Sequence, residues 1–101
     1  MRGELEARGP GAVVLKFGSS VLRDKSDLPL VVSEIYRRRR DGRKVIAVVS
    51  AFAGETDTLI AEAASVGGAK SRHAPRLIAL GEERSAALLA IACEAAGLDA
   101  L

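Results

Sequence analysis

The chain has 101 residues, 49% of them hydrophobic and 3% aromatic, with a formal net charge of +2. This length suits at most one small domain, and the mixed charges lack the basic excess that is typical of nucleic-acid binders. No apolar run approaches the roughly 20 residues that span a bilayer, and the N-terminal residues lack the apolar segment of a signal peptide. The single cysteine excludes an internal disulfide and fits a reducing compartment. We therefore expect a cytoplasmic protein with neither a nucleic-acid nor a membrane partner.

The first predicted elements are an arm and a strand. Residues Met1–Gly11 are charged and end in glycine and proline, which predicts a flexible arm. Ala12–Phe17 is apolar on both faces and contains two β-branched residues, which predicts a strand buried on both sides. Gly18–Lys25 is then expected to be a loop.

The next segment has the signals of a helix. Ser26 or Asp27 can cap it, Pro29 suits its first turn, and Gly42 can end it after about Asp41. Apolar residues recur along one face at helical spacing. They are Leu28, Val31, Val32, Ile35 and Tyr36.

The second half repeats the order of strand, loop and helix. Val45–Val49 is the second predicted strand, and a second helix is expected to begin at Thr56 or Asp57. After a glycine-containing break, Pro75 begins a short helix that Gly81 is expected to interrupt. A long Ala/Leu-rich helix, Glu82–Ala96, follows, and Leu98–Leu101 is predicted to start a third strand.

This order of elements predicts an α/β fold with a mainly parallel sheet flanked by helices. Strands separated by helices of this length are normally parallel and joined by right-handed crossovers. The carboxyl ends of parallel strands lie at one edge, where open α/β sheets bind ligands. We therefore expect residues 16–20 and 50–57 to face one crevice.

The residues at this predicted edge suit an anionic ligand. Lys16 is a cation at the end of a strand, and Gly18, Ser19 and Ser20 can turn backbone N–H groups outward, an arrangement that suits phosphate oxygens. The spacing is that of neither a P-loop nor a dinucleotide-binding turn. By itself, Lys16 also fits a solvated strand-end cation.

A polar substrate could be held by three further residues. Ser50 and Thr56 offer hydroxyl groups, and Glu82 could pair with an ammonium group. Thr56 equally fits an ordinary helix cap, and Glu82 an acid favoured in the first turn of a helix. The basic run Arg37–Arg40 is interpreted as a solvated helix end, and Cys93 as a small buried hydrophobe. The sequence contains no His/Cys cluster, so no metal site is predicted.

Three motifs resemble those of aspartokinases, members of the amino acid kinase family. Lys16-Phe17-Gly18-Ser19-Ser20-Val21 is similar to their Lys-Phe-Gly-Gly-(Thr/Ser)-Ser-Val opening. Val48–Ala51, followed by Thr56-Asp57 and Leu59, resembles the second motif. Leu80–Leu89 resembles the third, a Gly-Glu-x-x-Ser-x-x-Leu helix start.

The resemblance implies a role for each matching residue. Lys16 would contact the transferring phosphoryl group, and Gly18, Ser19 and Ser20 would lie beneath the phosphates. Ser50 and Thr56 would surround the amino acid, and Glu82 would bind its ammonium group. The list of implied catalytic and binding residues is therefore Lys16; Gly18, Ser19 and Ser20; Ser50, Thr56 and Glu82.

The resemblance also implies an activity and a fold. Residues 12–101 would be the N-terminal part of an amino acid kinase domain, a partial three-layer sandwich. The family transfers a phosphoryl group from Mg-ATP to the side-chain carboxylate of aspartate. The chain ends before the family's nucleotide-binding half, so we expect the isolated chain to need this C-terminal half as a partner and to be inactive alone. A homo-oligomer is expected.

One departure from the family pattern favours an alternative. The glycine loop is one residue shorter, and Ser19 stands where a second glycine is usual. Glycine allows close approach of the backbone to a ligand and a positive φ angle. The short loop resembles those of the aspartokinase-like domains fused to homoserine dehydrogenases. The alternative is therefore a non-catalytic regulatory or dimerisation module associated with a homoserine dehydrogenase.

Overall fold

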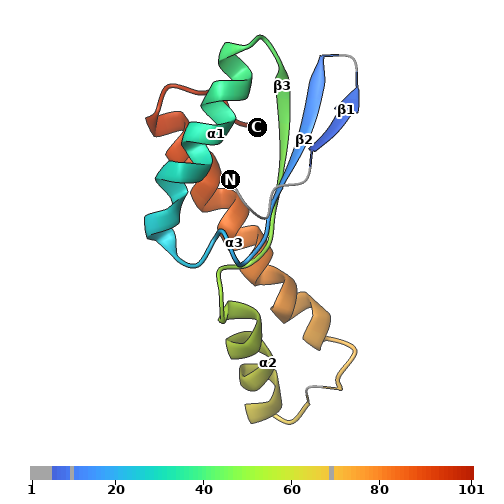
Figure 1. Ribbon diagram of the computed structural model, residues 1–101. Coiled ribbons are helices and arrows are strands. Elements are labelled where there is room, and N and C mark those ends of the chain that lie inside the picture. The colour runs from blue at the N-terminus through green and yellow to red at the C-terminus, as the bar shows by residue number, and fades with distance from the viewer. Residues whose placement is uncertain (1–5, 10, 69) are drawn as a thin grey trace.

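The structure is a computed structural model that describes residues 6–9, 11–68 and 70–101. Figure 1 shows a small sheet with two helices packed beside it. The first part of the longer of these helices forms a hairpin with a third helix, and this hairpin extends beyond one end of the sheet. In chain order the elements are β1 (Glu6–Gly9), β2 (Ala12–Phe17), the short 3-10 helix η1 (Lys25–Asp27), α1 (Leu28–Arg40), β3 (Lys44–Val49), α2 (Glu55–Ser65) and α3 (Ala74–Ala95).

The sheet has the strand order β1-β2-β3. As predicted, β2 and β3 are parallel, with Phe17 opposite Val49 at their carboxyl ends. The expected arm is wrong for Glu6–Gly9, which pairs antiparallel with β2 as β1. The short run Glu-Ala-Arg-Gly has no strand pattern of its own, so its pairing depends on the edge that β2 offers. Within the rest of that arm, residues 1–5 and 10 lie outside the described residues, and Gly11 lies in a turn.

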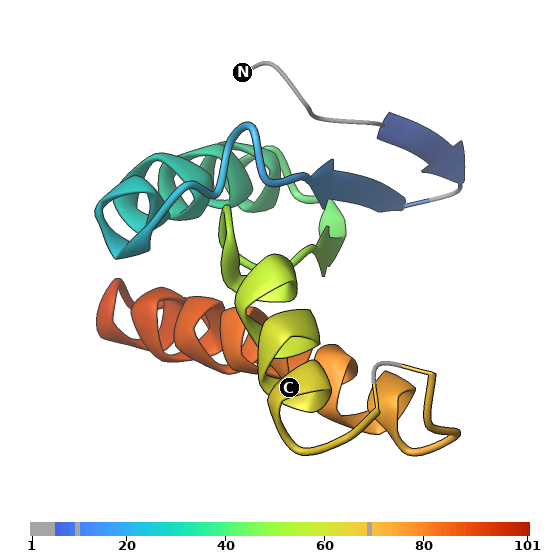
Figure 2. The same cartoon turned by 90° about the horizontal axis from the view of Figure 1, so that it is seen from below.

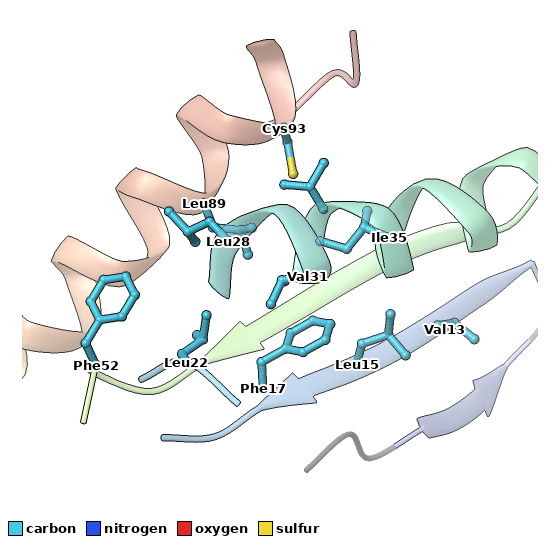
Figure 3. Packing of buried hydrophobic residues seen from close by; sticks show 11 residues of the cluster. Val13, Leu15, Phe17, Leu22, Leu28, Val31, Ile35, Phe52, Leu89 and Cys93 are labelled. Carbon is cyan, nitrogen blue, oxygen red and sulfur yellow. The ribbon is translucent and has the colours of Figure 1, made fainter. Parts of the chain in front are cut away.

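Helices α1 and α3 pack on the same face of the sheet (Figure 2). Val13, Leu15 and Phe17 point toward these helices and are fully buried (Figure 3). On the opposite face, Ile46 is 56% and Val48 is 43% exposed. The α/β class is confirmed, but β2 is buried on one face alone, because among the described residues helices cover only that face.

Helix α1 follows the sequence signals closely. Pro29 lies in its first turn, and Gly42 follows its end with a φ angle of 84°. Four of the five predicted core residues are buried, whereas Tyr36 is 51% exposed. Asp27 precedes the helix but makes no side-chain capping hydrogen bond, because its carboxylate binds Arg23 instead. The helix end at Arg37–Arg40 carries the basic run that the C-terminal end of a helix dipole favours.

Helix α3 is continuous through Gly81, so the predicted interruption is wrong. A Cβ atom at Gly81 would lie 3.0 Å from Cβ of Ala51 and 3.3 Å from Cδ1 of Leu59. The glycine therefore permits a close crossing rather than a break. Residues Leu98–Leu101 form no strand either. Further along α3, Cys93 is buried as expected, and this burial raises the pKa of its thiol.

None of the helices within residues 6–9, 11–68 and 70–101 has the length and apolar character needed to cross a membrane.

Candidate functional site at the carboxyl edge of the sheet

The structure brings the two predicted loops together where β2 and β3 end. The backbone N–H of Ser50 donates to the carbonyl oxygen of Phe17 at 3.1 Å. The Ser50 hydroxyl donates to the same oxygen at 3.4 Å. Ser50 thus lies directly beside the tip of β2, where the Gly18 loop begins.

The loop after β2 is a tight turn closed by the carbonyl of Gly18. That oxygen accepts hydrogen bonds from the N–H groups of Val21, at 3.0 Å, and Leu22, at 2.9 Å. Ser19 and Ser20 are exposed, and no backbone hydrogen bond within the described part of the chain uses their N–H groups. Two backbone donors next to Lys16 are therefore available to an anion.

Serine fits this shortened loop without backbone strain. None of the described residues other than glycine has a positive φ angle, so Ser19 does not need the conformation that glycine favours. A Cβ atom at Gly18 would meet nothing within 4 Å, so a ligand can approach the backbone there closely. The missing second glycine is thus compatible with phosphate binding.

Lys16 leaves the sheet on the face opposite α1 and α3. It is exposed, whereas its neighbours Leu15 and Phe17 are fully buried. Its Cα partner across the sheet is Val48, two residues before Ser50. The alternation of a strand therefore places the lysine stem on the open face, and its length lets the ammonium group reach toward the strand tips.

The first turn of α2 follows the tip of β3 immediately. Gly54 precedes the helix with a φ angle of 81°, a conformation that glycine adopts readily. The helix begins at Glu55, one residue before the predicted start. Thr56 lies in this first turn and is exposed, so its hydroxyl is accessible to a ligand.

Glu82 comes close to this edge because of the crossing at Gly81. The Cβ atom that lies 3.0 Å from a Cβ atom placed at Gly81 belongs to Ala51, the residue after Ser50. Glu82 is the next residue along α3 and is exposed. Three segments that are distant in the sequence therefore meet here: the tip of β2, the loop after β3 and the third turn of α3.

An ion pair fixes the far end of the loop after β2. Oδ2 of Asp27 accepts hydrogen bonds from the backbone N–H of Arg23, at 2.9 Å, and from its Nε, at 3.0 Å. Oδ1 accepts from Nη2 at 2.9 Å. These hydrogen bonds, first from the Arg23 side chain and then from its backbone, lower the pKa of Asp27 from 3.8 to about 2.

This pKa predicts an acid-dependent loss of stability. Because the folded-state pKa is lower than the unfolded one, the stabilising contribution of Asp27 is complete above about pH 4 and is lost as the pH falls toward 2. Urea unfolding at several pH values should show a shallower decline over this interval for Asp27→Asn than for the wild type. Asp57→Asn, which changes an exposed carboxylate, is the control. Equal slopes for Asp27→Asn and the wild type would contradict the prediction.

Two hollows in the described part of the structure lie away from this edge. One, of about 620 Å³, lies between α1 and α3 near Tyr36. The other, of about 590 Å³, runs beside β3 and is lined by residues that include Val45 and Leu98. Neither is lined by a predicted site residue. The candidate site is therefore part of neither hollow.

Sequence reasoning missed a contact cluster at the edge. Arg84 on α3 donates to Glu55 at 3.0 Å, and its guanidinium lies 5.6 Å from the centre of the Phe52 ring. Glu55 and Arg84 are 29 residues apart, so no local spacing connects them. The available signal was indirect: Glu55 directly precedes Thr56 of the second motif, and Arg84 lies within the third motif.

A pair of parallel strands with a lysine, a small-residue turn and polar helix starts at its carboxyl edge is typical of the class of α/β proteins that hold a small anionic ligand at that edge. A profile of the amino acid kinase family matches residues 11–101. The chain therefore belongs to the amino acid kinase family, as its motifs predicted.

Individual relatives agree with this assignment. The aspartokinase of Mycolicibacterium smegmatis is 36% identical over 89 residues, 87% of this chain and 21% of that protein. Aspartokinase 2 of Bacillus subtilis (strain 168) is 29% identical over 92 residues, 90% of this chain and 22% of its own length. The crystal structure of aspartate kinase from Synechocystis matches with a TM-score of 0.74 and 30% identity, over 80% of this chain and 14% of that one. The chain thus spans about a fifth of the length of these curated relatives.

Proposed function

We propose that the chain is the substrate-side portion of an aspartate kinase-type phosphotransferase. In this reaction a carboxylate oxygen of aspartate forms a bond to the γ-phosphorus of ATP, and the bond to the β-phosphate oxygen breaks, giving 4-phospho-L-aspartate and ADP. The observation that supports the proposal is the close crossing of Gly81 and Ala51, because Gly81 is next to Glu82 in the chain and Ala51 is next to Ser50.

The phosphate side of the site would be formed by the loop after β2. Phosphoryl transfer depends mainly on positioning and on stabilising negative charge. Lys16 supplies a positive charge, and the N–H groups of Ser19 and Ser20 supply uncommitted donors. Mg-ATP would provide the phosphoryl group and the metal charge that neutralises it. The open space at Gly18 supports the fit of a phosphate group.

The amino acid side would be formed by residues of the other two segments. The carboxylate of Glu82 would bind the ammonium group of aspartate, since both are charged and Glu82 is accessible. The hydroxyl groups of Ser50 and Thr56 would orient the substrate carboxylates. With these roles, the attacking carboxylate would lie between Glu82 and Lys16.

The complete reaction would need polypeptide beyond this portion. The chain matches about a fifth of the length of its aspartokinase relatives. We therefore propose that the isolated chain binds the amino acid but transfers no phosphoryl group, and that transfer takes place in a cytoplasmic homo-oligomer that contains the nucleotide-binding half.

Binding of L-aspartate to Glu82→Gln tests this assignment. Succinate has the same two carboxylates but no ammonium group, so the variant should lose affinity for L-aspartate by about tenfold and affinity for succinate by much less. Calorimetric titration of the wild type and the variant with both ligands measures the difference.

Glu83→Gln is the matched control, because Glu83 is the adjacent exposed glutamate. It should leave both affinities near those of the wild type. An equal loss in the two variants would assign the effect to general charge and contradict the role of Glu82. A wild-type chain that binds neither ligand would contradict the proposed function and favour the non-catalytic module.

A further inference from the structure

Arg84, on α3, contacts two segments that follow β3: the loop that contains Phe52 and the first turn of α2. Nη1 lies 3.0 Å from Oε2 of Glu55, in the first turn of α2. The guanidinium carbon lies 5.6 Å from the centre of the Phe52 ring, in the loop after β3. Figure 3 shows Phe52 on this loop beside α3. One side chain of α3 therefore contacts both the loop and the helix that follow β3.

The contacts are anchored in the core on one side and open to water on the other. Phe52 is 6% exposed, so the ring is fixed by packing. The side chain of Arg84 is 51% and that of Glu55 is 21% exposed. Gly81, one turn earlier on α3, supplies the close backbone crossing. Arg84 lies at the outer rim of that crossing, where it can limit movement of α2 against α3.

Arginine suits this position because one planar group can make both contacts. A guanidinium stacks on an aromatic face and still donates to a carboxylate in its plane, whereas the ammonium of lysine is a strongly hydrated point charge. An exposed ion pair or an exposed cation–π contact contributes little to global stability. The contacts of Arg84 are therefore better suited to holding local geometry than to supporting the fold.

Each residue proposed to bind aspartate is close in sequence to one member of this cluster. Ser50 is two residues before Phe52, Thr56 directly follows Glu55, and Glu82 is two residues before Arg84. We propose that Arg84 is a positioning residue that, through Glu55 and Phe52, sets the separation between Glu82 and the Ser50–Thr56 side of the site. The part of this inference that concerns substrate rests on the proposed function.

Hydrogen exchange on the free chain tests the positioning role without any ligand. The probes are the N–H of Ala53, which donates to Leu22, and that of Thr58, which donates to Gly54. Arg84→Met keeps an unbranched apolar stem but removes both contacts, so these two amides should exchange about fivefold faster. The N–H of Leu98, bonded to Cys93 at the far end of α3, should be unchanged.

Two further sets of variants separate positioning from loss of charge or of fold. Arg76→Met removes an exposed arginine from the same helix and should leave all three amides as in the wild type. Glu55→Arg and Arg84→Glu should each accelerate exchange at Ala53 and Thr58. The double variant recreates an ion pair of reversed polarity and should restore part of the protection. The midpoint of urea unfolding should change little in Arg84→Met.

Titration with L-aspartate then connects the cluster to the site. Arg84→Met should weaken binding about tenfold, whereas Arg76→Met should not. Unchanged exchange in Arg84→Met, or no recovery in the double variant, would overturn the positioning role whether or not aspartate binds. Faster exchange with undiminished aspartate affinity would overturn its link to the substrate. Absence of aspartate binding in the wild type would count against the proposed function, while the exchange results would still decide the positioning role.

Discussion

Replacing Lys16 by alanine is expected to slow phosphoryl transfer to aspartate by about 10²–10³-fold, since removing one group that stabilises transition-state charge typically has this effect. The prediction applies to a form of the protein that contains the nucleotide-binding half. Lys16 is exposed on the open face of the sheet, so the substitution should barely change the free energy of unfolding. Release of ADP in the presence of L-aspartate measures the rate, and urea unfolding measures stability.

Lys44→Ala is the matched control for this experiment. Lys44 is also an exposed lysine on a strand, but it begins β3, at the edge of the sheet opposite the candidate site. It should retain nearly the full rate of transfer. A comparable loss of rate in both variants would indicate a general effect of positive charge. Loss of folding in Lys16→Ala would identify Lys16 as a structural residue.

Leu22→Ala is expected to lower the free energy of unfolding by about 2–5 kcal/mol, the range observed when a buried leucine is truncated. Leu22 is fully buried and belongs to the main hydrophobic cluster. Its backbone N–H donates to Gly18, and its carbonyl oxygen accepts from Ala53. The substitution should therefore destabilise the core and loosen both loops of the candidate site. Urea unfolding monitored by circular dichroism measures the change.

Leu30→Ala is the matched control for Leu22→Ala. Leu30 lies on α1 and is 61% exposed. Its truncation should change the free energy of unfolding by no more than about 0.5 kcal/mol, as is usual for surface substitutions. A loss at position 22 as small as the loss at position 30 would show that Leu22 does not contribute to the core as described.

The elements that local patterns determine could be predicted from the sequence. The apolar runs of β2 and β3 and the helix between them required parallel pairing, which the structure shows. The proline and glycine signals of α1 were also correctly interpreted. These features were predictable because the hydrophobic period, the turn residues and the crossover rule all indicate the same fold.

The features that sequence reasoning missed depend on contacts between distant segments. Gly81 disfavours a helix locally, yet α3 continues through it. Ala51 and Leu59 occupy the space next to Gly81 that a larger side chain would need. The pairing of β1 likewise depends on β2 and not on its own residues. At the candidate site, the meeting of Ser50 with the tip of β2 was predictable from topology. The cluster of Arg84, Glu55 and Phe52 was not, because no periodic pattern connects residues 29 or more positions apart.

The continuity of α3 has a consequence for the evolution of this edge. One continuous helix carries Glu82 in its first half, and Leu89 and Cys93, which are buried beside the sheet, in its second half. A change in side-chain volume at Leu89 would push the helix as a whole, and the displacement would be transmitted to the Glu82 carboxylate. With the proposed function, substitutions in the interior would tune substrate selectivity without altering any residue proposed to bind the ligand.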